Sequence, residues 1–286
     1  MKTKDVFLFF VVCVAESIWA DSGMWTSATG GNWSDTANWS AATPASGSGS
    51  TAYLTTGSGT VTNDTTGLAL LGLQLSGSGF LLTGNALTLD SGGWIKALSG
   101  DHEVALPITL SGPASLTAAS NQTLTASGAI SGDGAVMVSG GRVILGNAAN
   151  AFTGPAVLRT GLLEVASIRA LGAGTAPVVL GRGTFRYAGT APGDLAQGYT
   201  VSNGGGNAST VLDIRTNLTV SGKVDAPSAG GGRVVKIGSG TIAYTYPGYQ
   251  VMNRGGSGVT TDRNLIIDTL NGGAGVEGYH DFTIAE

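Results

Sequence analysis

The segment Leu124-Thr125-Ala126-Ser127-Gly128 carries the pattern that decides the fold of this chain. Its two apolar residues, Leu124 and Ala126, alternate with Thr125 and so lie on one face of a short strand. Ser127 and Gly128 follow as a turn, because Gly tolerates the positive φ that many turns require. Close variants of this phrase recur at Leu73–Gly77, Leu87–Gly92, Ile108–Gly112, Val136–Gly140 and Leu218–Gly222. Repeated short strands closed by Ser-Gly predict an all-β repeat architecture.

Two all-β folds fit such short strands, a β-sandwich and a parallel β-helix. A sandwich usually has about 100 residues, several core aromatics and more charge at its turns. This chain has small, uniform phrases and few aromatic residues after residue 40. We therefore predict a right-handed, single-stranded parallel β-helix, a solenoid whose narrow interior is filled by stacked Val, Leu, Ile and Ala. At about 20–25 residues per coil, the mature chain would make roughly 11–13 coils.

Composition limits the class of protein further. The chain has 48 Gly among 286 residues and 11% charged residues, against usual shares of about 7% and about 25%. Its 42% apolar content argues against intrinsic disorder, and the absence of a three-residue Gly period excludes collagen. A single Cys excludes an internal disulfide framework and a Cys-based zinc site. The net charge of -4 offers no basic surface for nucleic acid, and we expect neither a nucleic-acid partner nor a cofactor.

The N-terminus has the pattern of a targeting segment. Lys2 and Lys4 precede an apolar run, residues 6–15, that is too short to span a bilayer but has the length of a signal-peptide core. We expect residues 1–20 to be a signal peptide cleaved after Ala20, with Ala15 as the alternative cleavage site. No later stretch has the pattern of a transmembrane helix. The sequence therefore predicts an exported protein, at the cell surface or in the extracellular medium.

Residues 121–180 contain a series of phrases whose order is more specific than any one of them. After the opening phrase come Gly128-Ala129-Ile130-Ser131-Gly132-Asp133-Gly134, Val143-Ile144-Leu145-Gly146-Asn147, Asn150-Ala151-Phe152-Thr153-Gly154, Gly161-Leu162-Leu163-Glu164-Val165 and Ala170-Leu171-Gly172. In this order they resemble the autotransporter-associated β-strand repeat of bacterial surface and secreted proteins. A second copy starts at Leu218 and includes Lys236-Ile237-Gly238-Ser239-Gly240-Thr241-Ile242. The first copy departs from the family pattern, because Val138-Ser139-Gly140-Gly141 replaces a Lys phrase and Phe152 replaces the usual Tyr.

The resemblance extends over most of residues 24–286. It implies a right-handed parallel β-helix, export, and a structural or adhesive role at the cell surface. Autotransporters also end in a membrane β-barrel, and no alternating strands of roughly ten residues occur before Glu286. We therefore expect residues 61–286 to be a β-strand-repeat solenoid that is either truncated at its C-terminus or a short secreted relative. The edge of its last coil would favour self-association.

The lead-in at residues 21–60 contains three Trp close together, Trp25, Trp33 and Trp39. One interpretation is a cap over the open first coil, which the end of a solenoid requires. The other is an aromatic platform that stacks against a sugar ring of a cell-surface or extracellular glycan. Trp94 stands alone after Gly92-Gly93, and we expect it to pack against the fold.

Candidate catalytic or metal-binding residues are sparse. His102 and His280 lie far apart and lack the spacing of a known site, so we expect both on surface turns. The 18 acidic residues are scattered along the chain, whereas polysaccharide lyases with this fold need clustered carboxylates. We expect turn ion pairs between Asp213 and Arg215, Lys223 and Asp225, and Asp262 and Arg263. Stacking of coils could still bring carboxylates together.

These observations predict a non-enzymatic, structural or adhesive segment of an exported protein, without catalytic or metal-binding residues. A glycan-binding module built on Trp25, Trp33 and Trp39 is the alternative. A β-helix polysaccharide lyase or hydrolase is the third interpretation, and it would need carboxylates stacked on adjacent coils.

Overall fold

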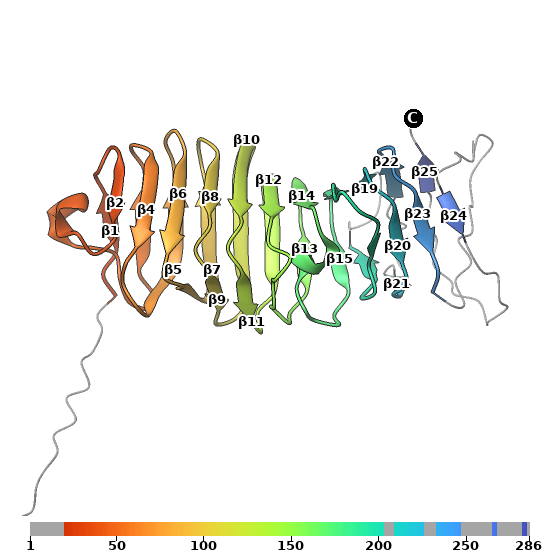
Figure 1. The fold of residues 1–286 in the computed structure, drawn as a ribbon, viewed down its shortest axis with the longest axis horizontal. Coiled ribbons are helices and arrows are strands. Elements are labelled where there is room, and N and C mark those ends of the chain that lie inside the picture. The colour runs from red at the N-terminus through yellow and green to blue at the C-terminus, as the bar shows by residue number, and fades with distance from the viewer. Residues whose placement is uncertain (1–19, 203–208, 226–232, 247–264, 268–281, 285–286) are drawn as a thin grey trace, which may run out of the picture.

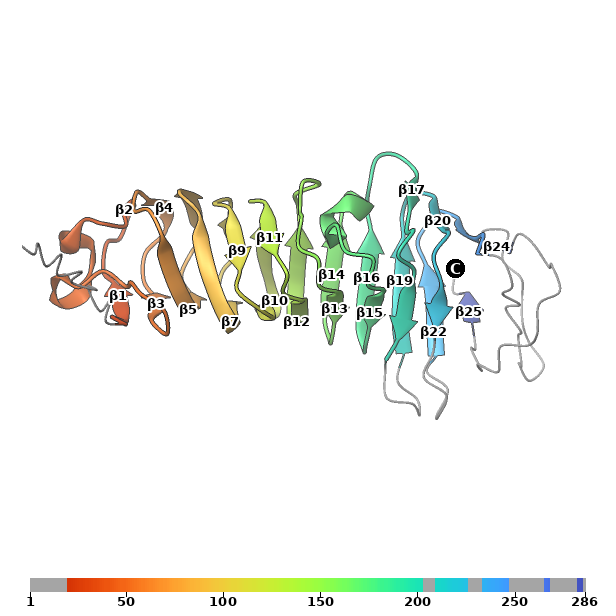
Figure 2. The same cartoon turned by 90° about the horizontal axis from the view of Figure 1, so that it is seen from below.

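The computed structural model describes residues 20–202, 209–225, 233–246, 265–267 and 282–284. In these residues the chain winds into an all-β solenoid built on parallel sheet. Figure 1 shows the turns stacked along the long axis, with the N-terminal turn at one end, and Figure 2 shows the same stack from below. The predicted parallel β-helix is confirmed, and its right-handed winding stays a prediction. The expectation of roughly 11–13 coils applies to the whole mature chain, whereas the structure describes only part of that chain. Residues 1–19 of the predicted signal peptide lie outside the described residues.

The strands form three hydrogen-bonded ladders, which we call faces A, B and C. Face A contains β1 (Gly23–Trp25), β3 (Thr51–Leu54), the C-terminal parts of β5 (Leu68–Leu75) and β7 (Leu87–Ala97), the N-terminal parts of β10 (Ala114–Ala126) and β12 (Val136–Leu145), β13 (Ala156–Leu158), β15 (Val178–Leu180), β18 (Tyr199–Val201) and β21 (Val224–Asp225). Face B contains β2 (Gly30–Asn32), β4 (Gly59–Asn63), β6 (Phe80–Gly84), β8 (His102–Val104), the C-terminal parts of β10 and β12, β14 (Leu162–Val165), β16 (Gly183–Tyr187), β19 (Ser209–Ile214), β22 (Arg233–Ile237) and β25 (Phe282–Ile284).

Face C is the shortest of the three. It begins with the N-terminal parts of β5 and β7 and continues through β9 (Ile108–Leu110) and β11 (Ile130–Gly132). In the later turns a separate four-stranded sheet takes this position, made of β17 (Gly193–Asp194), β20 (Leu218–Val220), β23 (Ile242–Tyr244) and β24 (Leu265–Ile267). The described residues also form three short 3-10 helices, η1 (Thr36–Asn38), η2 (Ser40–Ala42) and η3 (Ile168–Leu171).

The length of a turn is set by three strands, not by one repeated phrase. On face A, Leu75 pairs with Ala97 and Ala97 with Ala118, so that one turn takes 22 and then 21 residues. The phrases Leu73–Gly77 and Val136–Gly140 include face A strands, whereas Leu124–Gly128 includes a face B strand. The irregular spacing of the phrases is therefore explained, because each marks the end of a strand on whichever face it lies.

Inward side chains stack in columns that fill the solenoid. The column along face B consists of Phe80, His102, Leu124, Val143, Leu163, Phe185, Leu212 and Lys236. Leu124 and Ala126 are buried and Thr125 is half-buried on the outer side, as the alternation in this phrase predicts. Because full burial of a Val, Leu or Phe side chain gains about 1.5–3 kcal/mol, such columns are the main source of stability.

The corner between faces A and B requires a left-handed backbone in successive turns. Gly77, Gly100, Asn121, Gly140 and Gly161 occupy it, with φ of 111°, 80°, 63°, 87° and 79°. All four of these glycines also lie directly against backbone carbonyl groups of the turn below. At Gly161 an added Cβ would lie 1.6 Å from the Gly140 carbonyl oxygen. At Gly161 glycine is therefore needed for both conformation and space, whereas Asn121 adopts the same left-handed conformation with a side chain in one turn.

Candidate functional sites: the tryptophan cap and the charge ladder

Trp25, Trp33 and Trp39 form one buried cluster at the N-terminal end. The ring centroids of Trp25 and Trp39 lie 5.1 Å apart and those of Trp33 and Trp39 lie 4.8 Å apart, both edge to face. The Trp33 indole donates to the carbonyl oxygen of Ala45 at 2.9 Å, and the Trp39 indole donates to that of Trp33 at 2.7 Å. The Trp25 indole N–H is buried and has no hydrogen-bond partner among the described residues. Edge-to-face packing and the two satisfied indole N–H groups are typical of a well-ordered core.

Burial of these rings favours the cap over the sugar platform. Trp25, Trp33 and Trp39 are 0%, 1% and 3% exposed, whereas a stacking platform must offer a ring face to solvent. β1 and β2 already pair with β3 and β4, so that the solenoid ladders begin within the Trp-rich lead-in. The glycan platform stays a prediction, and it would require these rings to become exposed.

A groove of about 640 Å³ runs beside the cap. It is bordered by Trp33 and by mostly small or hydroxyl residues, including Ser34, Thr43, Ser46 and Thr65. Its volume is within the usual range for small-molecule sites, about 300–1,000 Å³, although such sites are mostly apolar and aromatic. The exposed lining is more apolar than polar, and its hydroxyl side chains can form hydrogen bonds to a ligand.

Trp94 lies on the outer side of face A, half-buried, and it packs against the fold as expected. Its six-membered ring covers Gly72, where an added Cβ would lie 2.3 Å from the ring. The Lys96 Nζ sits 4.2 Å from the ring centroid. A cation at this distance from Trp is a stabilising contact, of about 0.5–1 kcal/mol at exposed sites.

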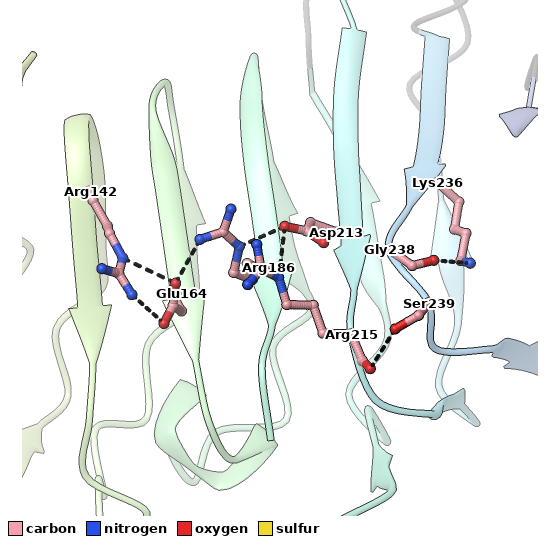
Figure 3. Close-up of polar contacts among 8 residues, drawn as sticks. All are labelled: Arg142, Glu164, Arg186, Asp213, Arg215, Lys236, Gly238 and Ser239. Carbon is pink, nitrogen blue, oxygen red and sulfur yellow. Dashed lines mark hydrogen bonds and ion pairs between the residues drawn. The ribbon is translucent and has the colours of Figure 1, made fainter. Parts of the chain in front are cut away.

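Five charged residues on the outer side of face B form a continuous ladder across four turns (Figure 3). Arg142 donates to Glu164 through both Nε at 3.1 Å and Nη2 at 2.6 Å. Arg186 donates to Glu164 at 3.0 Å through Nη1 and to Asp213 at 2.6 Å through Nε. Arg215 adds a 3.3 Å contact to the same Asp213 oxygen. We call this chain of contacts the charge ladder.

The carboxylates of the charge ladder are shielded from water and paired with guanidinium groups. The side chains of Glu164 and Asp213 are only 13% and 5% exposed. Burial alone would raise the pKa of Glu164, but hydrogen bonds from Arg142 and Arg186 outweigh it and lower the pKa below its usual value. The pKa of Glu164 is thus lowered, whereas a general acid would need a raised pKa.

Only one contact of the charge ladder was predicted from the sequence. The expected pair of Asp213 and Arg215 is confirmed, but the shorter contact of Asp213 is to Arg186, 27 residues away. Arg142, Glu164 and Arg186 follow at steps of 22 residues, which is close to the turn length on face A. That spacing is the signal that could have identified the charge ladder. The side chain of Asp225 and the pair Asp262 and Arg263 lie outside the described residues.

His102 is buried, and the expectation that it lies on a surface turn is wrong. It points inward from β8, is 3% exposed and stacks on Phe80 with a centroid distance of 5.8 Å. Its Nδ1 accepts from the Phe80 backbone N–H at 3.0 Å, and its Nε2 lies 2.7 Å from the Ser99 carbonyl oxygen. These contacts assign the neutral tautomer with hydrogen on Nε2. Burial lowers the pKa of His102, against the opposing effects of Ser99 and Asp101. His280 lies outside the described residues.

Lys236 is a second polar member of the inward column. It pairs with Leu212 and is 3% exposed. Its Nζ donates to the Gly238 carbonyl oxygen at 2.8 Å, which ties the side chain to the turn after β22 (Figure 3). The family pattern includes a Lys at this phrase, and here the Lys fixes a turn.

Among the residues that the structure describes, no three His, Cys, Asp or Glu side chains gather closely enough to hold a metal ion. The lyase interpretation therefore has no observation in its favour, and it stays a prediction. In the same part of the chain, no helix has the length and apolarity to cross a membrane.

Comparison with known proteins gives one informative similarity. Over 200 residues, 67% of this chain, the sequence is 29% identical to the Adhesin BmaC autotransporter of Brucella suis biovar 1 (strain 1330). The matched part is 5% of the length of that protein, so that the chain spans a small share of the relative it matches. No family model and no solved structure match the chain. The similarity and the solenoid fold fit an autotransporter passenger, and the specific repeat type stays a prediction.

Proposed function

We propose that this chain is a non-enzymatic passenger segment of an exported surface protein, with a structural and adhesive role. The observation that carries this proposal is the 29% identity over 200 residues with an autotransporter adhesin, in a chain that folds as a parallel β-solenoid. A solenoid suits this role because it presents a long repeated surface while each turn contacts only its neighbours.

The chemistry of the outer faces supports the same proposal. The shielded carboxylates Glu164 and Asp213 are paired with guanidinium groups in the charge ladder. On face A, Thr117 and Ser139 make a hydroxyl contact of 3.0 Å between neighbouring turns. Such contacts consolidate an extended, hydrated surface that could contact another surface over many turns.

The test is adhesion by the isolated chain. Beads coated with the 286-residue chain are applied to epithelial monolayers and to bare plastic, and bound beads are counted after washing. Adhesive function predicts several-fold more bound beads than with a Leu145→Asp variant, in which a buried charge disrupts the fold. Equal binding by folded and unfolded protein, with folding checked by circular dichroism, would rule out an adhesive solenoid.

Glycan binding is the second candidate, and the groove beside the cap is the feature that favours it. A Thr43→Trp variant fills the groove without removing a buried Trp of the cap, and Thr83→Trp on face B serves as the matched control. Glycan binding at the groove predicts that array signals of the wild type are lost in Thr43→Trp alone. A blank array with a folded wild-type chain would remove this candidate and leave the adhesive proposal to the bead assay.

A further inference from the structure

Two columns of outward side chains run beside each other along face A. All members of the first column can form hydrogen bonds, and we call it the polar column: Gln74, Lys96, Thr117, Ser139 and Arg159. The second is mostly apolar, and we call it the apolar column: Trp94, Ser115, Met137, Val157 and Val179. Strands β7, β10, β12 and β13, which carry most of these residues, follow one another along the rod (Figure 2).

The two cations of the polar column lie against the apolar column. Lys96 Nζ sits 4.2 Å from the centroid of the Trp94 ring, and Arg159 Nη2 lies 3.0 Å from the Met137 sulfur. Trp94 and Met137 are two turns apart, which separates these contacts by about 10 Å. Neither cation takes part in the four ion pairs of the described residues, which all belong to the charge ladder on face B.

Every charged side chain that the structure describes on the outer side of face A is a cation. Asp225 ends β21 at the far end of this face, and its side chain lies outside the described residues. Asp90 and Asp133 precede the face A parts of their turns, on the side of face C. An anion along the polar column would therefore be attracted by Lys96 and Arg159 without a competing carboxylate among the described side chains of this surface.

We propose that the outer side of face A binds an anionic polysaccharide, a sugar chain with carboxylate or sulfate groups, laid along the rod. Its anionic groups pair with Lys96 and Arg159. Thr117 and Ser139, whose hydroxyl oxygens lie 3.0 Å apart, offer hydrogen bonds to sugar hydroxyls between the two cations. The apolar column contacts the C–H groups of the sugar rings. A depression of about 360 Å³ beside Arg159 continues this surface.

The chemistry of face A favours a sugar chain over a membrane or a peptide. Basic segments that bind acidic lipid contain clusters of about 4–8 Lys or Arg, each contributing about 1 kcal/mol, whereas this surface has two described cations. A peptide that joins a sheet adds a strand at an open edge, but β10 and β12 pair with neighbours on both sides. A polysaccharide needs neither feature, because its separate charges and hydroxyls meet side chains at the spacing of the turns.

This inference goes beyond the proposed adhesive function and uses a surface other than the groove beside the cap. Bead adhesion through another outer face would leave it untouched, so that either proposal can fail while the other holds. Because the contacts are exposed and charged, binding should be moderate and sensitive to salt.

The test is fluorescence anisotropy of labelled oligosaccharides with the full 286-residue chain, at about 0.05 M and about 0.5 M NaCl. The probes are oligogalacturonate, which carries carboxylates, a heparin oligosaccharide, which carries sulfates, and neutral dextran of the same length. The proposal predicts that one or both anionic probes bind at low salt and are released at high salt, and that dextran does not bind. The two anionic probes distinguish carboxylate from sulfate recognition. Binding of neither, or equal binding of dextran, overturns the proposal, as does binding only to phosphatidylserine vesicles.

Removal of single charges locates the site. Lys96→Gln and Arg159→Gln should each weaken binding of the anionic probe about two- to fivefold, since each removes one exposed charge contact. Arg169→Gln removes an exposed cation from η3, off face A, and serves as the matched control. Thr43→Trp, which fills the groove beside the cap, should also leave binding unchanged. Equal loss in Arg169→Gln overturns the proposed surface.

A relocated cation separates this surface from net charge. In Arg159→Gln/Ser139→Arg the cation stays in the polar column, one turn away, and binding should return close to that of the wild type. In Arg159→Gln/Thr153→Arg the cation occupies an exposed position off face A, and the loss should remain. Recovery in both double variants, or in neither, with folding checked by circular dichroism, overturns the proposal.

Discussion

In four of the five successive turns named above, glycine occupies the corner between faces A and B, where the chain lies against carbonyl groups of the turn below. A Cβ at Gly100 would lie 2.0 Å from the Gly77 carbonyl oxygen, and one at Gly140 would lie 2.0 Å from that of Ala118. At Gly128, which is not at this corner, the distance to the Leu106 carbonyl oxygen would be 1.9 Å. The abundance of Gly is thus explained by close packing between turns as well as by positive φ.

Gly161→Ala separates these two causes when it is compared with Gly92→Ala. Both residues have nearly the same φ, 79° and 78°, but a Cβ at Gly92 has nothing within 4 Å, whereas at Gly161 it meets the Gly140 carbonyl. We expect Gly92→Ala to cost about 1–2 kcal/mol from backbone strain and Gly161→Ala to cost more than about 3 kcal/mol. Urea titrations of both variants measure the difference. Equal losses of unfolding free energy would show that the close approach of the neighbouring turn does not add to the destabilisation.

His102 predicts a loss of stability on mild acidification. Its pKa is lowered in the folded state, mainly by burial, so that the unfolded chain binds the proton more readily. The stability it contributes is present above the unfolded pKa of about 6.5 and is lost as pH falls toward the folded pKa. Melting temperatures at pH 7.5 and 5.5 should therefore differ in the wild type. They should differ less in His102→Gln, whose amide oxygen can still accept from Phe80. An unchanged pH dependence in that variant would exclude His102 as the cause.

The strands that carry the charge ladder show how outer contacts reinforce the stacking of turns. Neighbouring parallel strands could slip by two residues and keep apolar side chains inward, so the core alone specifies the register weakly. Glu164 on β14 binds Arg142 on β12 and Arg186 on β16, and Asp213 on β19 binds Arg186 as well. A two-residue slip would break these contacts, so that the charge ladder favours the observed register.

Arg186 should be the most sensitive member of the charge ladder, because it contacts both carboxylates. Arg186→Met leaves Asp213, with a 5% exposed side chain, only the longer contact to Arg215. We expect a loss of about 2–4 kcal/mol in the free energy of unfolding, against less than about 1 kcal/mol for Arg215→Met at a 54% exposed side chain. Adding Asp213→Asn to Arg186→Met should recover part of the loss. No recovery would mean that the unpaired carboxylate is not what destabilises the variant.

Across the whole molecule, stability is a sum of turn-to-turn contacts, and the two ends differ from the middle. The Trp cluster supplies the first turn with the packing partner that every later turn receives from the turn before it. Trp39 is central to this cluster, since it contacts both Trp25 and Trp33. Loss of the cap should therefore loosen the first turns before the rest of the rod.

Trp39→Ala tests this view of the cap. Removal of a buried Trp costs about 3–5 kcal/mol, and nearest-neighbour coupling should confine its effect. We expect faster amide hydrogen exchange in β1 and β3, and unchanged exchange in β12 and β14. Trp94→Ala, at a half-buried position on the outer side of face A, is the matched control and should change little. Uniformly faster exchange would instead indicate one cooperative unit.

The fold was predictable from the sequence, and its arrangement in space much less so. Alternation in Leu124–Ala126 was enough to identify the strands and their inward residues. It did not reveal that each turn uses three strands, so that residues 22 or 27 apart, such as Glu164, Arg186 and Asp213, become neighbours. His102 was misplaced because its surface position was predicted only from the lack of a known site spacing. Its alternation with Val104, which is also buried, was the signal that it points inward.

Because equivalent residues stack one turn apart, the number of turns sets the length of the rod. A pairing such as Leu75 with Ala97 repeats after 22 residues, and each repeat advances the rod by one strand spacing, about 4.8 Å. Duplication or deletion of one such unit within the gene would change the reach of the rod by that fixed step and leave its cross-section and its cap unaltered. The length of the rod can thus change only in whole turns, and it can change without altering the residues on the outer faces of the remaining turns.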